Sequence, residues 1–564
     1  MILPATRRFT ITERYTIGLD YGSLSCRGVL VSVTDGRIAA EASLAYPHGF
    51  IDQALPDGTP LPAGGQWCLQ HPVDYELALT TIVPQLMIQS GVEPRQVIGI
   101  GVDFTASTVI PVDKHFRPLC YQDAYASRPH AWCKKWKHHG AALQAELLNQ
   151  ACLEQLAPYL SWYGGRINSE CLTAKAAQIF MEDREIYNAA DAFVEAGDYI
   201  TSLLAGQPVI SASMAAAKAL WSREAGYPSP EFLSVIDPAF SHMPQEKLAE
   251  HLGVAPMAPG KQAGSLCPAM ADKLGLCPGI AVTPAQMDAY TPMLGLGIDR
   301  AGSMLMVIGT STAIMLLGEE YQPVQGVTAC LPDTYYPGLW GYASGQASVG
   351  DAFRWFTENN VPEPYHREAQ RLDLSLQQYL TQLAQPLKPG ETGLLALDWF
   401  NGNKSCLGNS RLSGMLLGLT LQTRPEEIYR ALLEATAFGA RRIIDAYREA
   451  SVPVTEILVC GGIPGKNPLL MQIYADVLGL PLKVSRCTQA PALGAAIYAA
   501  AAAGDQAGFT TVFEAVQAMH CRDFITYSPC EAHRRTYDLL YQEYLTLHDY
   551  FGQGGNPVME RLRR

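Results

Sequence analysis

Apolar and polar positions along the chain predict strands joined by glycine-containing turns, separated by longer helical segments. Residues 15–40 read as an apolar strand, a turn at Gly22-Ser23, a second strand and a turn at Asp35-Gly36. A similar unit recurs at residues 302–320, where the turn is Gly309-Thr310-Ser311. Two such units suggest that both halves of the chain follow one plan, although short hairpins also resemble each other by chance.

A carboxylate stands at the end of a predicted strand in the middle of the chain. Between the two hairpins the pattern predicts a buried strand at 97–107 and amphipathic helices through 141–222. We expect a domain boundary near residue 275, which gives domains 1–275 and 276–564. Just beyond it, the strand at 278–285 runs into Gln286-Met287-Asp288. Ligands of open α/β sheets collect at such strand ends.

The C-terminal part predicts a long helix and then a strand, a glycine pair and a second helix. Thr423 and Glu426 form a predicted capping box for the long helix. After the strand at 456–460 come Gly461-Gly462 and a helix that Asn467 caps, ending near Gly479. The order of strand, glycine pair and helix brings bare backbone and free N–H groups close to a ligand.

Length and composition indicate a compact α/β protein of two large domains with a cleft between them. The chain has 564 residues, of which 48% are hydrophobic and 17% charged. Its formal net charge of −13 argues against a nucleic-acid or anionic-membrane partner, because both require clustered Lys and Arg. The N-terminus has no signal-like apolar run, and no segment approaches the roughly 20 apolar residues of a membrane span. We therefore expect a cytoplasmic protein.

Several kinds of catalytic or metal site are excluded by their motifs. The 14 Cys include no CxxC pair, and no HExxH motif occurs, so neither a disulfide framework nor a zinc site is indicated. The P-loop GxxxxGK[ST] is absent, since Gly465-Lys466 is followed by Asn467. The GxSxG elbow and the HRD and DFG motifs are also missing, which removes serine hydrolases and protein kinases. Three loops of glycine and hydroxyl residues remain, together with Asp288.

Four segments in this order resemble the FGGY carbohydrate kinases: GLDYGSLSCRG, IGTST, GGIPGKNPLLMQIYADVLGLPLKV and PALGAAIYAA. Six more resemble ribulokinases in particular: IGIGVDFTAS, LQHPVDY, WKHHGA, YGGRINSE, LLALDWFNGN and LLEATAFGAR. The resemblance implies two actin/hexokinase-like (ribonuclease H-like) α/β domains with a central cleft. It also implies an enzyme that transfers the γ-phosphate of ATP, with Mg²⁺, to L-ribulose in L-arabinose catabolism.

The resemblance assigns roles residue by residue. Asp288 would be the base that accepts the proton of the sugar hydroxyl, and Asp20 would hold Mg²⁺ through water. The sugar would contact Ala106, Lys218, Asp288, Ala343 and Gln346. The nucleotide would lie against Ser23, Ser25, Arg27, Gly309, Thr310, Ser311, Gly461, Gly462, Lys466 and Asn467. The residues alone would also allow a helix cap at Asp288, tight turns at the glycines and a surface role for Lys218.

The sugar loop departs from the ribulokinase pattern, because Ala343 stands where similar kinases have Glu. Losing a hydrogen bond to a charged group costs about 1.5 to 3 kcal/mol, or about ten- to a hundredfold in sugar affinity. Gln286, Tyr290 or Ser344 could compensate. The alternatives are a kinase for another ketose or polyol, such as D-ribulose, xylulose or ribitol, and a weakly active regulatory protein that binds sugar or nucleotide. The oligomeric state, including a homo-oligomer, stays open.

Overall fold

The computed structural model describes residues 13–62 and 66–562, which form two compact units. Unit 1 contains the residues up to 151, Asn168–Gly297 and Gln489–His520. Unit 2 contains Cys152–Ile167, Ile298–Thr488 and the residues from 521 onward. The boundary expected at residue 275 falls inside unit 1, because the strands β10 and β11 that follow it both pair with strand β5 of that unit.

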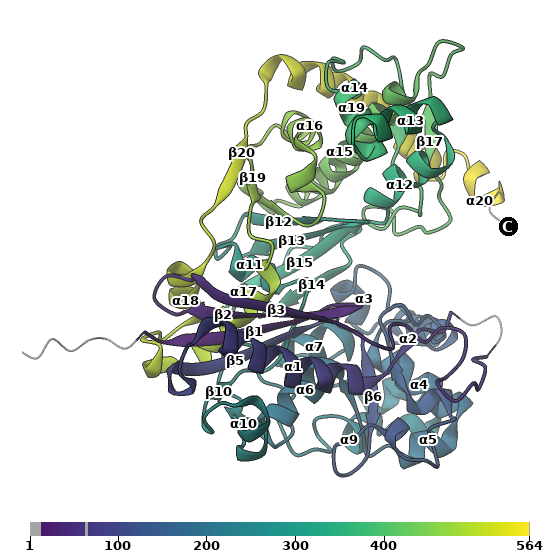
Figure 1. Cartoon of the computed structure of the whole chain (residues 1–564). Coiled ribbons are helices and arrows are strands. Elements are labelled where there is room, and N and C mark those ends of the chain that lie inside the picture. The colour runs from purple at the N-terminus through teal and green to yellow at the C-terminus, as the bar shows by residue number, and fades with distance from the viewer. Residues whose placement is uncertain (1–12, 63–65, 563–564) are drawn as a thin grey trace, which may run out of the picture. The chain divides into compact units, whose positions relative to one another are not determined.

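The main sheet of unit 1 has the strand order β3-β2-β1-β5-β10-β9, with β11 paired to β5 (Figure 1). Strand β1 is antiparallel to β2 and parallel to β5, so the carboxyl ends of β1, β5 and β11 reach the same edge. The strands are β1 (Tyr15–Tyr21), β2 (Ser25–Ser32), β3 (Ile38–Ala45), β5 (Val97–Phe104), β9 (Gly264–Ser265), β10 (Ala281–Val282) and β11 (Gln286–Met287).

Unit 2 repeats this plan with the strand order β14-β15-β13-β12-β18-β19-β20. Its first hairpin, β12–β13, is antiparallel, and β12 runs parallel to β18 as β1 does to β5. The shared pairing supports the common plan that the two hairpins suggested. The strands are β12 (Ser303–Ile308), β13 (Thr312–Gly318), β14 (Ala329–Pro332), β15 (Trp340–Gln346), β18 (Glu456–Cys460), β19 (Leu482–Ser485) and β20 (Phe524–Tyr527).

Helix α17 (Ala490–Ala502) packs directly on the first sheet, although it lies near the end of the chain (Figure 1). A Cβ atom at Gly18 of β1 would lie 1.8 Å from the carbonyl oxygen of Ala492. Glycine in the strand and alanine in the helix therefore allow this close approach. Other helices of unit 1 include α1 (Pro72–Ser90), α4 (Leu172–Glu182), α6 (Ala196–Ala205), α7 (Ala212–Lys218), α11 (Thr291–Gly295) and α18 (Val512–Met519).

The core of unit 2 lies between its sheet and a group of helices that includes α15 and α16. The long helix predicted from Thr423 begins at Pro425, because Arg424 takes the N-cap position and Glu427 accepts from its backbone N–H. The helices are α12 (Gly350–Asn359), α13 (Glu363–Arg371), α14 (Leu376–Ala384), α15 (Pro425–Glu449), α16 (Pro468–Leu478) and α19 (Glu531–Gly552). A short two-stranded sheet pairs β16 (Leu395–Leu397) with β17 (Met415–Leu417).

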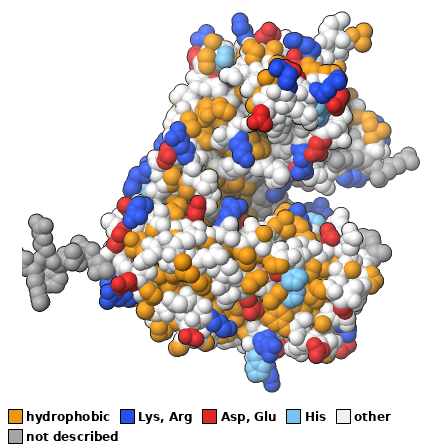
Figure 2. Space-filling view, viewed as in Figure 1, with side chains coloured by type: hydrophobic (Ala, Val, Ile, Leu, Met, Phe, Trp, Pro, Cys, Tyr) orange, Lys and Arg blue, Asp and Glu red, His pale blue; other side chains and the backbone are white. Residues whose placement is uncertain are grey.

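Basic and acidic side chains are interspersed over the face drawn in Figure 2. Within the part of the chain that the structure describes, every helix is too short or too polar to span a bilayer. The expectation about a signal sequence concerns mainly residues 1–12, which lie outside the described residues.

Candidate active site

The turn between β1 and β2 carries the first group of predicted phosphate and metal residues. Asp20 lies one residue before the end of β1 and stands opposite Arg27 of β2 in the antiparallel register. Asp20 is only 6% exposed, whereas Arg27 is exposed and Ser25 half-buried. The indole N–H of Trp136 donates to the Ser23 hydroxyl over 3.0 Å and so holds the turn in place. These residues do come together in one hairpin.

A second carboxyl group, Asp103, lies beside Asp20 because β1 and β5 pair in parallel register. Asp103 is fully buried, and Thr291 donates to its Oδ2 over 3.0 Å. Burial, together with the charges of Asp20 and Asp288, raises the pKa of Asp103 well above its usual range. Burial also raises the pKa of Asp20, and the neighbouring Asp103 carboxyl group and the charge of Arg27 oppose that rise.

Asp288 follows β11 directly at the same edge of the sheet. Its backbone N–H donates to the carbonyl oxygen of Phe104 over 3.0 Å, and its Oδ1 accepts from the N–H of Ala289 over 2.8 Å. The residue is half-buried, and α11 begins only at Thr291 with Tyr290 as its N-cap, so Asp288 is not the cap of that helix. Its carboxylate is held in a fixed position at the end of a strand.

The surroundings of Asp288 make it a stronger base than an ordinary aspartate. Burial and the negative charge of Asp20 raise its pKa to about 6, while Lys135 and Lys218 oppose that rise. At neutral pH the carboxylate is ionised, yet its proton affinity is much higher than that of an aspartate in water. This is the balance that a general base near neutral pH requires.

Lys135 lies beneath this edge of the sheet and is fully buried. Its Nζ donates to the hydroxyl of Thr105 over 2.7 Å and lies 5.5 Å from the centre of the Phe104 ring. Burial lowers the pKa of Lys135 to about 8, with Asp288 among the groups that oppose the shift. The ammonium group therefore remains charged at pH 7 and acts on Asp288 from inside the domain.

Lys218 and Ala106, the other predicted sugar contacts of unit 1, lie on two separate elements. Lys218 ends α7, and its Nζ lies 3.5 Å from Glu170 Oε2. Burial disfavours its charge, but Glu170 and other neighbouring groups outweigh that effect and raise the pKa of Lys218. Ala106 is half-buried in the loop after β5, next to Ser107, which has a positive φ of 61°. The buried ammonium of Lys175 donates to the Ser107 carbonyl and supports that strained loop.

Two of the three residues that could replace the missing Glu are engaged elsewhere. Ala343 is half-buried on β15, but the next residue, Ser344, points into the core, where its hydroxyl lies 2.6 Å from that of Tyr447. Gln286 is fully buried, and its Oε1 accepts from the Ser213 hydroxyl over 2.5 Å. Successive residues of a strand face opposite sides, so Ser344 cannot stand in for a side chain at position 343.

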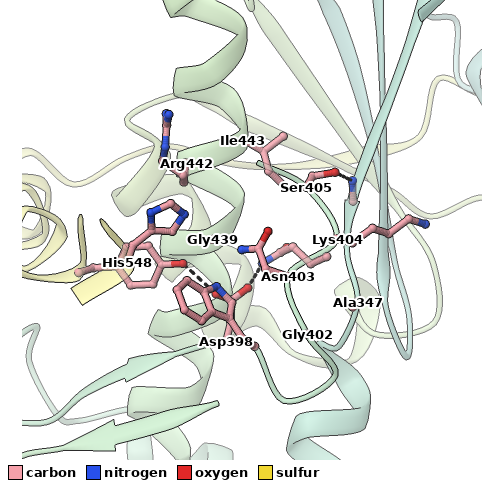
Figure 3. A pocket seen from close by; sticks show the side chains of 14 residues that line it. Ala347, Asp398, Gly402, Asn403, Lys404, Ser405, Gly439, Arg442, Ile443 and His548 are labelled. Atoms are coloured by element: carbon pink, nitrogen blue, oxygen red, sulfur yellow. Dashed lines mark hydrogen bonds between the residues drawn. The ribbon is translucent and has the colours of Figure 1, made fainter. Parts of the chain in front are cut away.

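Gln346 is also buried inside unit 2 instead of lying open to solvent, and it lines the same pocket as Asp398, which Figure 3 labels. Its Nε2 donates to Asp398 Oδ2 and to the carbonyl of Thr436, both over 2.8 Å. Tyr544 donates to the other oxygen of Asp398 over 2.9 Å, and burial raises the pKa of that carboxyl group to about 6. Gln346 and Asp398 line a small polar pocket in this unit. The contacts fit a residue that orients the end of β15.

The turn Gly309-Thr310-Ser311 in unit 2 occupies the place that the first hairpin has in unit 1. The N–H of Gly309 donates to the carbonyl of Ser311 over 2.8 Å, which closes the turn. The N–H groups of Val349 and Gly350, at the start of α12, donate to the carbonyls of Thr310 and Gly309. Thr310 and Ser311 are exposed, so this turn can accept a phosphate group on its outer side.

A large open pocket lies beside the glycine pair of unit 2. Gly461 has a φ of 113°, and a Cβ atom there would lie 2.3 Å from the carbonyl oxygen of Ile308, so a larger residue does not fit. Asn467 caps α16 by accepting from Leu470 over 3.0 Å, as predicted. The pocket is lined by Phe353, Ser375, Gln377, Gln378, Thr381, Tyr429, Gly462, Ile463, Lys466 and Asn467.

Asp20 would have to hold a divalent ion without a cage of protein ligands. Among the described residues, no group of three or more His, Cys, Asp or Glu is arranged to hold a metal ion. Asp103 is less suited to be a ligand, because it is fully buried and its Oδ2 already accepts from Thr291. The chemistry of a single carboxylate at Asp20 fits Mg²⁺, which binds proteins through one or two carboxylates and keeps waters and substrate phosphates as its other ligands.

Neither Asp103 nor Lys135 was identified as a site residue from the sequence. Asp103 had a signal, because the strand ends IGLD and IGVD place an acidic residue at matching positions of two apolar strands. Lys135 had none, since it stands in a run of lysines, histidines and tryptophans that gives no hint of which side chain is buried.

The chain matches two family models across most of its length. The N-terminal domain of the FGGY family of carbohydrate kinases matches residues 15–295, and the C-terminal domain matches residues 304–503. A protein named ribulokinase from Halalkalibacterium halodurans is 47% identical over 98% of both chains. A ribulokinase from Mycolicibacterium smegmatis is 41% identical over 98% of this chain and 96% of its own. A xylulose kinase from Rhodospirillum rubrum, 22% identical, matches with a TM-score of 0.77 over 95% of this chain and 98% of its own, which confirms the predicted fold.

Proposed function

Because the chain belongs to the FGGY family of carbohydrate kinases, we propose that it uses MgATP to convert L-ribulose to L-ribulose 5-phosphate. The relatives named ribulokinase support the choice of sugar, since they match over nearly the whole chain. The proposal places the enzyme in the cytoplasm and in L-arabinose catabolism. The observation that carries it is Asp288, a half-buried carboxylate with a pKa of about 6, fixed at the sheet edge that also holds Asp20.

In the proposed reaction, Asp288 accepts the proton of the sugar hydroxyl while the hydroxyl oxygen forms a bond to the γ-phosphorus. The bond between that phosphorus and the bridging oxygen breaks, and ADP leaves with the electron pair. The backbone contacts to Phe104 and Ala289 keep the carboxylate aimed at one place. General base catalysis of this kind contributes about 10² to 10⁴ in rate.

Charged residues of unit 1 would hold the reactants and tune the base. Lys135 keeps Asp288 ionised near neutral pH, and Lys218 donates hydrogen bonds to the oxygens of the sugar. Asp20, which is only 6% exposed near the end of β1, would hold Mg²⁺ through water. Bound Mg²⁺ would neutralise charge on the phosphates during transfer.

The glycine loops of unit 2 would hold the nucleotide. The exposed backbone at Thr310 and Ser311 suits phosphate oxygens, and the pocket beside Gly462 suits the rest of the nucleotide. Lys466 and Asn467 line that pocket, next to the aromatic ring of Tyr429. These contacts need little net positive charge, which fits the acidic composition of the chain.

A second candidate function is phosphorylation of another ketose or a polyol, and Ala343 favours it. Ser344 and Gln286 are engaged in internal hydrogen bonds, and the third residue that could replace the Glu, Tyr290, carries a phenol instead of a carboxylate. Tyr290 is 7% exposed and lies close enough to Lys218 to affect its charge. Its phenol could hydrogen-bond a sugar hydroxyl but would not supply a negative charge.

The test is ADP release from MgATP with L-ribulose, D-ribulose, xyluloses, ribitol and glycerol, for the natural chain and for Ala343→Glu. We expect the highest kcat/KM with L-ribulose. Restoring the carboxylate should lower the KM for L-ribulose by about tenfold or more, the value of a hydrogen bond to a charged group. Preference for another sugar that Ala343→Glu shifts toward L-ribulose would favour the second candidate. No turnover with any of them would contradict both.

A further inference from the structure

Two cysteines stand at the places where the chain leaves and re-enters unit 2. The chain passes from unit 2 to unit 1 after Thr488 and returns at Cys521, so Cys487 and Cys521 flank the inserted segment that contains α17 and α18. The antiparallel strands β19 and β20 bring these passages together, with Ser485 opposite Phe524. The backbone pairing of these two passages extends one residue pair beyond the strands.

Beyond the strands, the backbone N–H of Arg486 donates to the carbonyl of Asp523 over 3.0 Å. Cys487 follows Arg486 directly, and Cys521 precedes Asp523 by two residues, so both lie next to this backbone hydrogen bond. Their thiols share a hydrogen bond. The sheet therefore brings together two thiols that are distant in sequence.

The sulfur of Cys521 is surrounded by donors. The N–H of Asp523 donates to it over 3.4 Å, and the thiol of Cys487 and the hydroxyl of Ser485 also hydrogen-bond to it. With the Cys487 contact as the largest cause, these bonds lower the pKa of Cys521 to about 6. Both cysteines are partly exposed, so a small oxidant can reach them.

The other cysteines of the described chain do not combine exposure to solvent with a hydrogen-bonded thiol neighbour. Nine of the fourteen are buried, and burial raises the pKa of several of them, such as Cys68 and Cys133, to about 11. Cys530 is more exposed than Cys521, but within the described residues no second thiol hydrogen-bonds to its sulfur. Reactivity of a thiol depends on its thiolate fraction as well as on access.

We propose that Cys487 and Cys521 are a redox-reactive dithiol that a hydroperoxide converts to a disulfide, which links the two passages of the chain. The inference is independent of the sugar that the enzyme uses. The disulfide would tie together both ends of the segment whose helix α17 supports β1, the strand that carries Asp20.

The chemistry proceeds in two steps that balance. The Cys521 thiolate attacks one oxygen of hydrogen peroxide, the O–O bond breaks, and hydroxide leaves, so Cys521 becomes a sulfenic acid. The sulfur of Cys487 then attacks the Cys521 sulfur. The S–S bond forms, the S–O bond breaks, and the released oxygen leaves as water with the Cys487 proton. Together the two thiols lose two electrons and reduce one peroxide to two waters.

The experiment treats the reduced full-length protein with hydrogen peroxide, blocks remaining thiols with an alkylating agent and identifies peptides by mass spectrometry. We expect a cross-linked peptide that joins Cys487 to Cys521 and disappears with dithiothreitol. Cys487→Ser should leave a sulfenic acid on Cys521 that a cyclic 1,3-diketone traps, which also shows which thiol is attacked first. Cys530→Ser is the matched control and should leave the cross-link unchanged.

Two outcomes would overturn the proposal. One is oxidation of Cys521 beyond the sulfenic acid in the natural chain with no link to Cys487. The other is consumption of Cys530 at least as fast as Cys521 at pH 7, because the hydrogen bonds around Cys521 should favour its thiolate. Circular dichroism of each variant separates loss of fold from loss of the reaction.

Discussion

Replacing Lys135 with Met should move the acid limb of the pH–rate profile upward. A general base works only when deprotonated, so kcat/KM should fall below the pKa of Asp288, which is about 6. The positive charge of Lys135 holds that pKa down, and with a pKa of about 8 it stays charged across the whole acid limb. Removing the charge must therefore raise the pKa of Asp288 and weaken activity at low pH.

The size of the shift follows from the arrangement around Phe104. Lys135 Nζ lies 5.5 Å from the centre of that ring, and the carbonyl of Phe104 accepts from the backbone of Asp288. At an effective dielectric constant of about 20, a charge about 8 Å away contributes about 2 kcal/mol, of which solvent screening at a half-buried group leaves about half. Since one pKa unit is about 1.4 kcal/mol, we expect a rise of about 0.7 to 1.5 units.

The assay is kcat/KM for the preferred sugar from about pH 5 to pH 9 at saturating MgATP, because this ratio reports the ionisation of the free enzyme. At pH 6 the variant should be several times slower than the natural chain, and above pH 8 the two should converge, because Lys135 then loses its own charge. Asp20, Asp103 and Lys218 also act on Asp288 and stay unchanged in the comparison.

Lys137→Met is the matched control. Lys137 is exposed, and its Nζ lies over the ring of Phe50 at 4.9 Å, away from the groups that act on Asp288. The acid limb of the Lys137→Met profile should coincide with that of the natural chain. This comparison also accounts for protonation of ATP itself, which affects both proteins equally. Coincident limbs for Lys135→Met and Lys137→Met would refute the assignment of Lys135 as the charge that tunes the base.

Two isosteric changes should differ greatly in their effect on kcat. Asp288→Asn removes the proton acceptor, so kcat should fall by about 10² to 10⁴ while the Kd of MgATP, measured by calorimetry, stays nearly the same; unchanged turnover would rule Asp288 out as the base. Asp103→Asn should keep kcat within about threefold, because burial raises the pKa of Asp103 well above its usual range and an amide, like a neutral carboxyl group, can accept from Thr291 and donate to a neighbouring oxygen. A much larger loss at Asp103 would mean that this residue acts as an anion.

Local sequence patterns were sufficient to predict most of the elements that carry the site. The hairpin turns at Gly22-Ser23 and 309–311 and the helix capped by Asn467 lie where the sequence predicts them. These features depend on turn residues and capping, which act between residues a few positions apart. The strand predicted at 278–285 is instead two short strands, β10 and β11, and β11 begins only at Gln286. The start of α15 also differs: Arg424 takes the cap position expected for Thr423, because Thr423 instead accepts from Thr420.

The sequence could not show which polar residues are engaged in the interior. Ser344, Gln286 and Gln346 all stand near predicted sugar contacts, yet each hydrogen-bonds to a partner from a distant segment. A strand residue can face either the core or the solvent, and the choice depends on which face of the sheet the helices cover.

The amino-acid sequence by itself determined the two α/β domains, the glycine loops and the carboxylate at the end of β11. Only the tertiary structure decided the electrostatics of the site. Parallel pairing of β1, β5 and β11 places Asp20, Asp103 and Asp288 at one edge, and Lys135 reaches them from another loop. A pKa depends on burial and on charges within several ångströms, and for these residues the neighbours come from segments far apart in the chain.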